Sequence, residues 1–511
     1  MKRQLDRIAG KTFDVAIIGG GIVGAFVACD ASRRGLSVLL LEAKDFGMAT
    51  SEAMSHLVHG GLRYLAQGQL SMVMESLAER NRWLRFAPHH VSPQPFLLPL
   101  KNNFSIDKRI GLGLFEMFGK AAGGIEGALR SRVLSRTEAA ETEPALAGAA
   151  QGGAILYNDA RVDSPERAVL SLLLDATSRG AIVANHCPVK CIRTNNGHVT
   201  GLDAKDALTG DDFYIDARIV VNCAGAFADR VSGLVGTSKA GLSLTRSKGI
   251  HVIASPITKT HALALSGKGE HAFVVPVKGY SLIGTTDDVF EGEEPKAEEE
   301  EQAGLVKRLH RLLPGLEPLK IVGSFAGVRA LSKSSGSTYR ASRDIVLVDH
   351  GFFGCKGFFS LTGGKWTTAR RMAEKMVDRI AALLERPLKT CDTTIVPLSN
   401  SPAENLDTFL KRFPTPQHSR MKSLYHTYGA QALDLVAGFS AGKPGQAESS
   451  YMQDLENTLF NHAFQHEMAV TSDDLLHRIG RFALLDDPDI AGRAAVWFAQ
   501  KAKLGQSVSQ Y

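Results

Sequence analysis

The start of the chain combines two mostly apolar runs with a helical segment between them. Residues 14–18 and 36–41 have the composition of buried strands, and residues 25–34 have the composition of a helix. Because a strand–helix–strand order favours parallel pairing of the two strands, this pattern predicts an α/β fold built on a parallel sheet.

Further helices and strands are expected beyond this unit. Apolar residues recur at helical spacing over 70–86 and 163–178. Residues 219–226 form another buried apolar run, which can return beside the first sheet and add a second backbone wall to a cofactor site. Shorter strands are predicted at 94–100, 181–184, 189–193, 199–204 and 213–215.

The pattern of apolar and polar positions changes twice in the second half of the chain. Residues 249–286 alternate between apolar and polar positions with Gly and Pro interruptions, which predicts a separate antiparallel sheet. The acidic run 291–301 is expected to be a solvated loop that enters a helix before Leu313. From residue 399 helical spacing dominates, which predicts a separate helical C-terminal domain. The intervening elements are strands at 321–331 and 344–348 and a helix ending near Leu384.

Composition narrows the class of protein. A chain of 511 residues is too long for one core, so two or three domains are expected, and 44% hydrophobic content is ordinary for a soluble globular protein. The amino terminus lacks the apolar core of a secretory signal, and the longest apolar stretch, 15–29, is too short to span a membrane. The six cysteines lack the paired spacing of a zinc site, so we expect buried reduced thiols and no metal.

Net charge bears on the partners of the protein. A charge of +6 is small for this length, so we expect no nucleic acid as a partner. The same charge suits an anionic substrate or an anionic membrane surface. Residues 101–136 carry seven Lys/Arg residues against three acids and enclose the apolar run 110–118. A solvated helical excursion and a membrane-binding patch are both compatible with this stretch.

A glycine-rich turn joins the first strand to the first helix. Gly19, Gly20, Gly21 and Gly24 contain the spacing GxGxxG, and Glu42 ends the second strand. Gly19 allows the tight turn, Gly21 lets the backbone approach a pyrophosphate, and Gly24 lets helix and strand pack closely. Amide donors at the helix N-terminus would bind the phosphates, and Glu42 would accept hydrogen bonds from a ribose. The pattern predicts a dinucleotide site.

Other segments carry small and polar residues suited to the same site. Residues 46–65 are dense in hydroxyl and glycine residues, which indicates either a loop folded over the cofactor or a plain Ser/Gly loop leading into a helix. Residues 361–368 place a Gly-Gly turn at a helix start, where backbone amides can meet negative charge. With the end of the 219–226 run, these segments supply the cofactor candidates Thr50, Ser51, Ser55, Gly60, Gly61, Ala224, Gly225, Gly364, Lys365, Trp366 and Thr367.

Four motifs stand in the order of a known family. They are the glycine turn of 15–24, the stretch 55–65 with HGGLRY at its centre, 325–329 and 363–368. On these motifs the chain resembles the FAD-dependent glycerol-3-phosphate dehydrogenases, which are D-amino-acid-oxidase-like flavoproteins. The resemblance runs from about residue 12 to about residue 500, and it includes the C-terminal stretch 481–486.

The resemblance implies FAD as cofactor and a three-part architecture. The implied fold is α/β, with a glutathione-reductase-like FAD-binding Rossmann domain, an antiparallel-sheet substrate domain and a helical C-terminal domain. We place the oxidoreductase region at 12–395 and the helical domain at 399–511. The FAD-binding segments are expected at about 12–100, 150–235 and 340–390, and the substrate segments at about 101–149 and 236–339.

The resemblance also implies roles for individual residues. Arg63 and Tyr64 would line the substrate side of the flavin, with Arg63 also catalytic, while Arg329, Arg343 and Lys365 would hold the substrate phosphate. A phosphate dianion taken out of water needs several charge-assisted donors, and arginine offers a bidentate fork. Arg329 has no acid nearby in sequence, so we expect the phosphate to be its anionic partner.

The predicted reaction is oxidation of sn-glycerol 3-phosphate to dihydroxyacetone phosphate, by hydride transfer to flavin N5 with electrons passed to a quinone. His251 and His59 are the candidates for the base, since imidazole accepts protons near neutral pH. Another polyol-phosphate dehydrogenase or a glycerol-3-phosphate oxidase is the nearest alternative, and a non-catalytic flavin-binding subunit is the alternative outside enzymes. The sequence departs from the family pattern at His56, Ala330 and Ala226–Phe227.

The resemblance finally implies a location. A protein that delivers electrons to a quinone would be cytoplasmic and peripherally associated with the inner membrane, with an anionic membrane surface as its partner. Homodimer formation is left open by the sequence.

Overall fold

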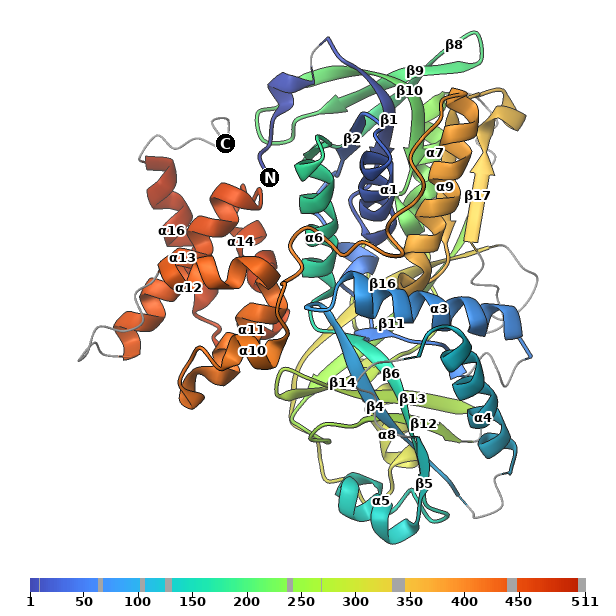
Figure 1. Cartoon of the computed structure of the whole chain (residues 1–511), viewed down its shortest axis with the longest axis vertical. Helices are drawn as coiled ribbons and strands as arrows, with labels where there is room; N and C mark the ends of the chain where they lie inside the picture. Colours follow the sequence, from blue (N-terminus) through green and yellow to red (C-terminus); the bar gives the residue numbers. More distant parts are fainter. Residues whose placement is uncertain are drawn as a thin grey trace.

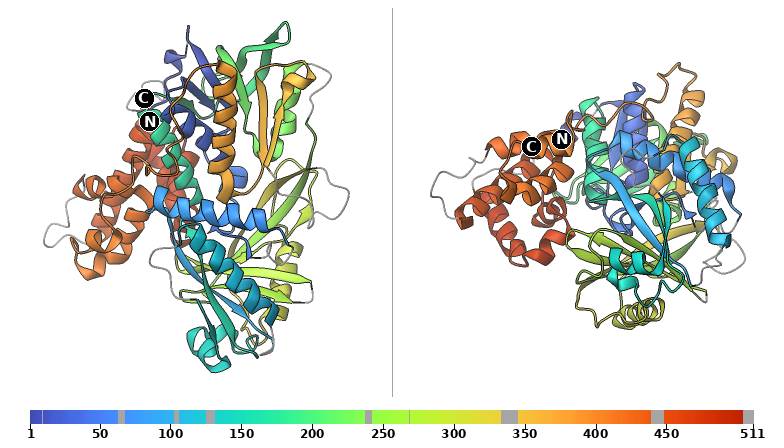
Figure 2. Two further views of the ribbon diagram at one scale, coloured as in Figure 1. Left: turned by 45° about the vertical axis from the view of Figure 1, so that its right-hand side comes forward. Right: turned by 60° about the horizontal axis from the view of Figure 1, so that its bottom comes forward.

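The computed structural model describes residues 1–8, 10–62, 68–101, 106–124, 131–236, 242–267, 269–332, 345–438 and 448–503. Two sheet domains lie one above the other, and a helical domain formed by the last hundred or so residues stands to one side of both (Figure 1). The further views of Figure 2 show the same separation, so the helical domain is a distinct body.

Within the described residues, the first sheet is mixed and has eight strands, and its centre is parallel. Its order is β17-β18-β10-β1-β2-β7, with the hairpin β8–β9 attached to β10. The helices α1, α6 and α9 share one apolar core with it. This sheet confirms the predicted α/β fold class. Its strands are β1 (Thr12–Ile18), β2 (Val38–Leu41), β7 (Ile182–Ala184), β8 (Val189–Asn195), β9 (His198–Lys205), β10 (Asp212–Asn222), β17 (Ile345–Asp349) and β18 (Phe358–Gly363), and its helices are α1 (Ile22–Arg33), α6 (Pro165–Ser178) and α9 (Ala369–Leu384).

The second sheet is largely antiparallel and has ten strands in the part of the chain that the structure describes. The predicted sheet over 249–286 is its centre, and β16 pairs with β11 along the whole length of β11. It also takes in β3, β4 and β6, which come from segments expected in the FAD-binding part. The strands are β3 (Leu57–Val58), β4 (Val91–Pro99), β5 (Arg132–Leu134), β6 (Ala154–Val162), β11 (Leu244–Ala254), β12 (Ala262–Gly267), β13 (Glu270–Val277), β14 (Tyr280–Gly284), β15 (Asp288–Val289) and β16 (Ile321–Ser332).

Two local predictions differ from the structure. Residues 213–215 and 219–222 belong to one continuous strand, β10, because its first half pairs with β9 and its second half with β1, and the predicted run 219–226 continues past the end of this strand. The acidic run 291–301 is not wholly a loop, because Glu299 already begins α8 (Glu299–Leu312). Three acids in a first turn are favoured there by the helix dipole.

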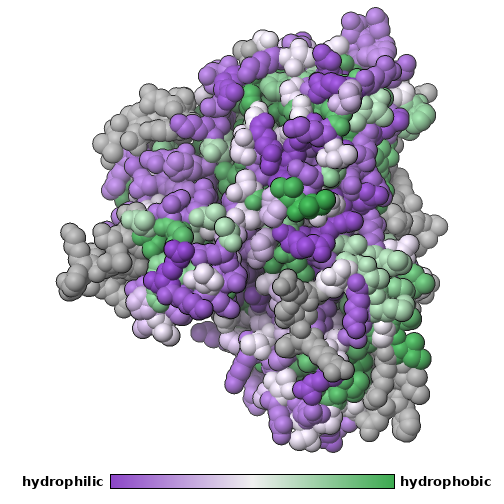
Figure 3. Space-filling model, viewed as in Figure 1, coloured by the Kyte–Doolittle hydropathy of each residue, from purple (hydrophilic) through white to green (hydrophobic). Residues whose placement is uncertain are grey.

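Two helices cover the outer side of the sheet domains near their junction. α3 (Leu70–Phe86) has the predicted bounds, and α4 (Ile106–Ala121) forms the helical part of the basic stretch. Ile110, Leu114 and Met117 are exposed along α4, whereas Leu112 and Phe115 are buried. Apolar surface gathers at the lower right of Figure 3, over the α4 side of the molecule (Figure 3). Two further short helices are α5 (Arg136–Thr142), which follows β5, and α7 (Ala228–Ser232), which comes after β10.

The predicted helical C-terminal domain is confirmed, and buried ion pairs attach it to the first domain. Arg167 of α6 donates to both carboxylate oxygens of Glu467 at 2.7 Å, and Arg478 donates to Asp45, which follows β2. Because breaking one partner of a buried pair is costly, these contacts hold the domain in place. Its helices are α10 (Leu406–Leu410), α11 (His418–Tyr428), α12 (Ala432–Gly438), α13 (Glu448–His466), α14 (Ser472–Ile479), α15 (Arg481–Asp486) and α16 (Ile490–Lys503).

A buried histidine at this junction should make stability depend on pH. Burial alone would lower the pKa of His477, but hydrogen bonds to Asp45 and Glu52 outweigh it and raise the pKa from 6.5 to about 9. A group whose folded pKa is raised stabilises the fold fully below its unfolded pKa, and this stability is lost as pH rises through the folded pKa. We therefore expect Tm to fall between pH 6.5 and about pH 9. Thermal unfolding of the wild type and His477→Gln would check this, and an equally steep fall in the variant would contradict it.

Candidate functional site

The glycine turn forms a tight backbone cradle at the N-terminus of α1. A Cβ on Gly24 would overlap the carbonyl oxygen of Gly19, and a Cβ on Gly19 would lie 2.8 Å from the carbonyl oxygen of Cys223. Gly19 has φ +108°, in the region that favours glycine. The turn therefore packs helix and strand as closely as a dinucleotide fold requires, with amides left at the helix start.

Glu42 and Ser51 frame this cradle. The carboxylate of Glu42 accepts hydrogen bonds from the backbone N–H of Gly20 at 2.7 Å and of Lys44 at 2.8 Å. Burial raises the pKa of Glu42, and the hydrogen bonds from Lys44 and Gly20 offset only part of that rise. Ser51 Oγ accepts from the N–H of Ile22 at 2.9 Å, so this hydroxyl already lies where a phosphate would meet the helix.

A second backbone wall comes from the end of β10. Asn222 Oδ1 accepts from the N–H of Ala224 at 3.1 Å, and Gly225 has φ +56°. Thr362 of β18 donates to the carbonyl oxygen of Gly225 at 2.7 Å. Because β10 lies directly beside β1, Ala224 and Gly225 stand next to the glycine turn, where the sequence expected them. These features fit a dinucleotide such as FAD.

The second sheet presents candidate substrate groups on one face of β11 and β16. The register pairs His251 with Phe325, Gly249 with Gly327, and Ser247 with Arg329. Residues two apart on a strand share a face, so all three pairs lie on the same surface. The outer pairs are about 13 Å apart along the strands, and the two opposed glycines lie between them.

His251 is a buried, uncharged imidazole on this face. Its ring stacks on Phe325 with centroids 4.9 Å apart, and a Cβ on the neighbouring Gly284 would overlap it. Its Nε2 lies 2.8 Å from Ser55 Oγ, and its Nδ1 has no hydrogen-bond partner within the described residues. Burial holds the pKa of His251 well below its ordinary value, and the charges of Arg329, His56 and Arg481 lower it further.

Arg329 has more partners than its sequence surroundings indicate. Its guanidinium donates to the carbonyl oxygen of Thr286 at 3.1 Å and to Thr285 Oγ1 at 2.6 Å. It lies 3.8 Å from Asp287 Oδ1, so a carboxylate that is distant in the strand sequence also stands beside it, and its role as a phosphate ligand stays a prediction. A Cβ on Gly249 would overlap the guanidinium, which therefore leans along the face toward His251.

The hydroxyl-rich loop lies across this face. Thr50 Oγ1 donates to the carbonyl oxygen of Val328 at 2.6 Å, and a Cβ on Gly327 would lie 2.6 Å from the carbonyl oxygen of Ala53. With Ser51 at the helix and Ser55 at the histidine, the loop connects the cradle to the second sheet. The described partners of Thr50, Ser51 and Ser55 are protein groups, and their roles toward the cofactor stay predictions.

The remaining candidates form a second group beside α3. The N–H of His59 donates to Thr367 Oγ1 at 3.3 Å, and Lys365 Nζ donates to Ser76 Oγ at 3.0 Å. The indole of Trp366 stacks on Trp83 with centroids 4.5 Å apart. Its side chain is half-buried and packs against the core of the first domain. The roles of this group stay predictions, and Gly61 and Gly364 lie beside it with positive φ.

Three predicted substrate residues lie outside the described residues: Arg63, Tyr64 and Arg343. Two supporting groups were not predicted. Asp159 of β6 accepts from the N–H of Gly60 at 2.9 Å and from Arg80 of α3 at 3.1 Å. Asp287 stands beside Arg329. Nothing in their sequence spacing marks either one, because strand pairing over long sequence separations brings them to the site.

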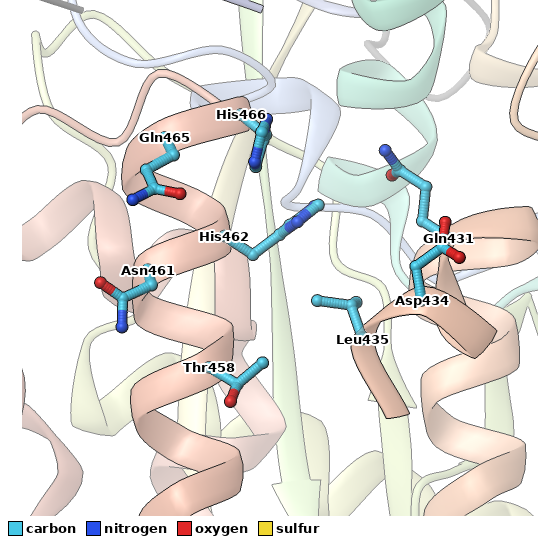
Figure 4. A pocket seen from close by; sticks show the side chains of 8 residues that line it. All are labelled: Gln431, Asp434, Leu435, Thr458, Asn461, His462, Gln465 and His466. Atoms are coloured by element: carbon cyan, nitrogen blue, oxygen red, sulfur yellow. The ribbon is translucent and has the colours of Figure 1, made fainter. Parts of the chain in front are cut away.

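A polar groove of about 420 Å³ lies elsewhere, between α12 and α13 of the helical domain (Figure 4). His462 points into it from α13 opposite Leu435 of α12. None of its lining residues is among the predicted site residues: Gln431, Asp434, Leu435, Thr458, Asn461, His462, Gln465 and His466. The groove is therefore separate from the cradle and from the face of β11 and β16.

The cradle and the two sheets define a flavoprotein oxidoreductase with a Rossmann-type domain and an antiparallel substrate domain. The sequence profile of the FAD dependent oxidoreductase family matches residues 14–378. The glycerol-3-phosphate dehydrogenase of Synechocystis sp. is 30% identical, with 94% of this chain and 91% of the relative aligned. The aerobic glycerol-3-phosphate dehydrogenase of Staphylococcus saprophyticus is 33% identical, over 73% and 68% of the two chains.

Solved structures agree with these relatives. The glycerol-3-phosphate dehydrogenase of Bacillus halodurans complexed with FAD superposes with a TM-score of 0.75 at 25% identity, covering 99% of this chain and 97% of its own. The L-alpha-glycerophosphate oxidase of Mycoplasma pneumoniae shares the fold, with a TM-score of 0.54 at 21% identity over 74% and 96% of the chains. The chain therefore belongs to the glycerol-3-phosphate dehydrogenase family of FAD-dependent oxidoreductases.

Proposed function

We propose that this protein oxidises sn-glycerol 3-phosphate to dihydroxyacetone phosphate with FAD as its cofactor. The observation that carries the proposal is the shared face of β11 and β16, where Arg329 and His251 lie on either side of two opposed glycines. Because the guanidinium leans over Gly249, it is about 7 Å along the strand from the histidine, which suits a three-carbon phosphate ester. The names of the relatives support the same substrate.

The chain's own residues would bind the substrate and take up a proton. Arg329 would hold the phosphate through its fork and so fix the carbon chain, which is where orientation contributes to rate. His251, held by Ser55 and Phe325, would accept the proton of the C2 hydroxyl in its neutral form. FAD, when bound in the glycine cradle, supplies the two-electron acceptor for the hydrogen on C2. Loss of that hydrogen with its electron pair and of the hydroxyl proton leaves a ketone.

Anaerobic mixing with glycerol 3-phosphate tests the proposal. We expect the yellow flavin absorbance to bleach, and glycerol without a phosphate should bleach it far more slowly because Arg329 then has nothing to hold. A flavin that stays oxidised would favour a non-catalytic flavin-binding subunit. Hydrogen peroxide formed in air at the rate of turnover would favour the oxidase alternative, and faster bleaching by another polyol phosphate would reassign the substrate.

The FAD should be bound without a covalent link. The contacts expected from the cradle are hydrogen bonds donated by backbone amides and hydrogen bonds accepted by Glu42, all of which acid unfolding would remove. Acid precipitation of the purified protein should therefore release the yellow colour into the supernatant. Colour retained in the pellet would indicate a covalent bond.

We further propose that electrons pass to a quinone at a membrane surface. The apolar residues Ile110, Leu114 and Met117 are spaced along one side of α4, and Leu70 and Met74 are exposed on α3, which packs against it; all five are between 38% and 60% exposed. Lys120 is an exposed cation on α4 itself, and the exposed Lys101 precedes α4 in the chain. No helix among the described residues is both long and apolar enough to cross a membrane. An apolar helix face bordered by cations is typical of interfacial binding.

Binding to anionic liposomes should therefore be reversible and sensitive to salt. Each cation near the surface would contribute roughly 1 kcal/mol, which screening by salt reduces. Co-sedimentation at low and high salt would measure it, and the triple variant Ile110→Gln, Leu114→Gln, Met117→Gln should bind less. Ile395→Gln is a matched control, because Ile395 is also exposed but lies after α9. Equal binding to neutral and anionic lipid would contradict the electrostatic part.

A further inference from the structure

Arg481 of the C-terminal domain reaches the substrate face of the second sheet. Arg481 begins α15, and its guanidinium carbon lies 3.9 Å from the ring centroid of Phe325. Phe325 is the same ring that stacks on His251 at 4.9 Å with an interplanar angle of 16°. The three side chains, from α15, β16 and β11, form a continuous contact.

The loop that contains Thr50, Ser51 and Ser55 fixes the position of Arg481 from the other side. Its Nη2 lies 3.4 Å from Glu52 Oε1, and Glu52 also binds His477, which in turn binds Asp45. Glu52 directly follows Ser51, whose hydroxyl meets the start of α1. The next residue of α15, Phe482, is buried in the core of the second domain. Arg481 is therefore anchored between this loop and the second sheet.

We propose that Arg481 is a positioning residue that holds the Phe325–His251 stack in the orientation used by the proposed reaction. It contacts neither the substrate nor the cofactor in this scheme, and it acts through Phe325. A cation over an aromatic face is attracted to it, so Arg481 restrains Phe325 and Phe325 restrains the imidazole. The inference rests on His251 being the base of the proposed function, and it makes the C-terminal domain a part of the active site.

Arg481 also adds positive charge near the imidazole. The charged or titratable groups that face His251 are Arg329 of β16, His56 of the preceding loop and Arg481 of α15. The charges of Arg329 and Arg481 disfavour the protonated imidazole, whereas His56 is itself buried and its pKa is lowered to about 3. Loss of the Arg481 charge should therefore move the protonation of His251 to higher pH, whereas loss of packing alone would not.

Arg481→Met and Arg481→Lys test the proposal together. Met keeps much of the volume but loses the cation, and we expect kcat for glycerol 3-phosphate to fall roughly three- to thirty-fold. The acidic limb of its kcat profile should move upward by roughly half a pH unit or more. Lys keeps the charge, so it should recover most of kcat and leave the limb at the wild-type position. Flavin content reports on folding in both variants.

Arg493→Met is a matched control, because Arg493 is an ion-paired arginine on α16 that contacts Glu456 and Asp487 instead. It should leave the pH profile unchanged. If Arg481→Met fails to fold, Arg481→Gln removes the same charge with a polar side chain and should move the limb in the same direction. If the acidic limb of the kcat–pH profile stays at the wild-type position in an Arg481→Met protein that holds flavin, the proposal is overturned. If glycerol 3-phosphate does not bleach the flavin of the wild type, the proposed function is overturned instead.

Discussion

Replacing His251 with asparagine should lower kcat for glycerol 3-phosphate by roughly 10²- to 10⁴-fold, which is the usual contribution of a general base. Asparagine is smaller than the ring and cannot accept a proton, and it is too short to keep the contact that the ring Nε2 makes with Ser55. The histidine contacts Ser55, Phe325 and Gly284, none of which belongs to the glycine cradle, so flavin content should be retained. Stopped-flow bleaching of the flavin measures the step directly.

His56→Asn is the matched control for this variant. His56 is also buried, its pKa is lowered by burial to about 3, and it stands next to Ser55, but it hydrogen-bonds the carbonyl oxygen of Val162. Asparagine tolerates the positive φ of +57° at this position, so the backbone should be kept. An equal loss of kcat in both variants would mean that buried histidines here support the fold. A large loss in His59→Asn with little in His251→Asn would move the base to His59.

The low pKa of His251 has a consequence for pH profiles. A weakly basic imidazole is a poor proton acceptor, but a bound phosphate would neutralise Arg329, whose charge is the largest of the neighbouring causes that lower the pKa of His251. The pKa of the base should therefore be higher in the substrate complex than in the free enzyme. The acidic limb of kcat should accordingly lie at higher pH than that of kcat/KM. Coincident limbs would argue that the phosphate binds away from Arg329.

Arg329→Lys should reduce kcat/KM for glycerol 3-phosphate by roughly ten- to hundred-fold, because a lost charge-assisted hydrogen bond costs about 1.5–3 kcal/mol. Lysine keeps the charge but loses the fork that now reaches Thr285 and Thr286. The loss should be small for unphosphorylated glycerol, which has no group to bind there. Steady-state kinetics with both substrates separate the two cases.

Arg246→Lys provides a matched control on the neighbouring strand. Arg246 of β11 also uses its fork, to the carbonyl oxygen of Ala226 and the carboxylate of Asp229. Losing that fork should affect both substrates alike. Asp287 stands 3.8 Å from Arg329, so the kinetics of Asp287→Asn can be compared with those of Arg329→Lys on the same two substrates. If Arg329→Lys lost activity equally on both substrates, its partner would be Asp287 and its role structural.

Local sequence alone determined the first part of the fold and the cofactor cradle. The glycine spacing, the flanking apolar runs and Glu42 are neighbours in the chain, and their geometry follows from one strand–turn–helix unit. The helix α3 has the bounds that its apolar spacing predicted, for the same reason. Motif order likewise led to the family, since each motif is a short contiguous stretch.

Only the tertiary structure decided what surrounds the substrate groups. The pairing of β11 with β16 sets Arg329 and His251 on one face, and the end of β14 brings Asp287 beside that arginine. The docking of α15 brings Arg481 onto Phe325. Register and docking depend on contacts between segments far apart in the chain, and a shift of one residue would turn every side chain of a strand to its other face. No local pattern encodes that choice, so the partners of both arginines could be found only in the folded molecule.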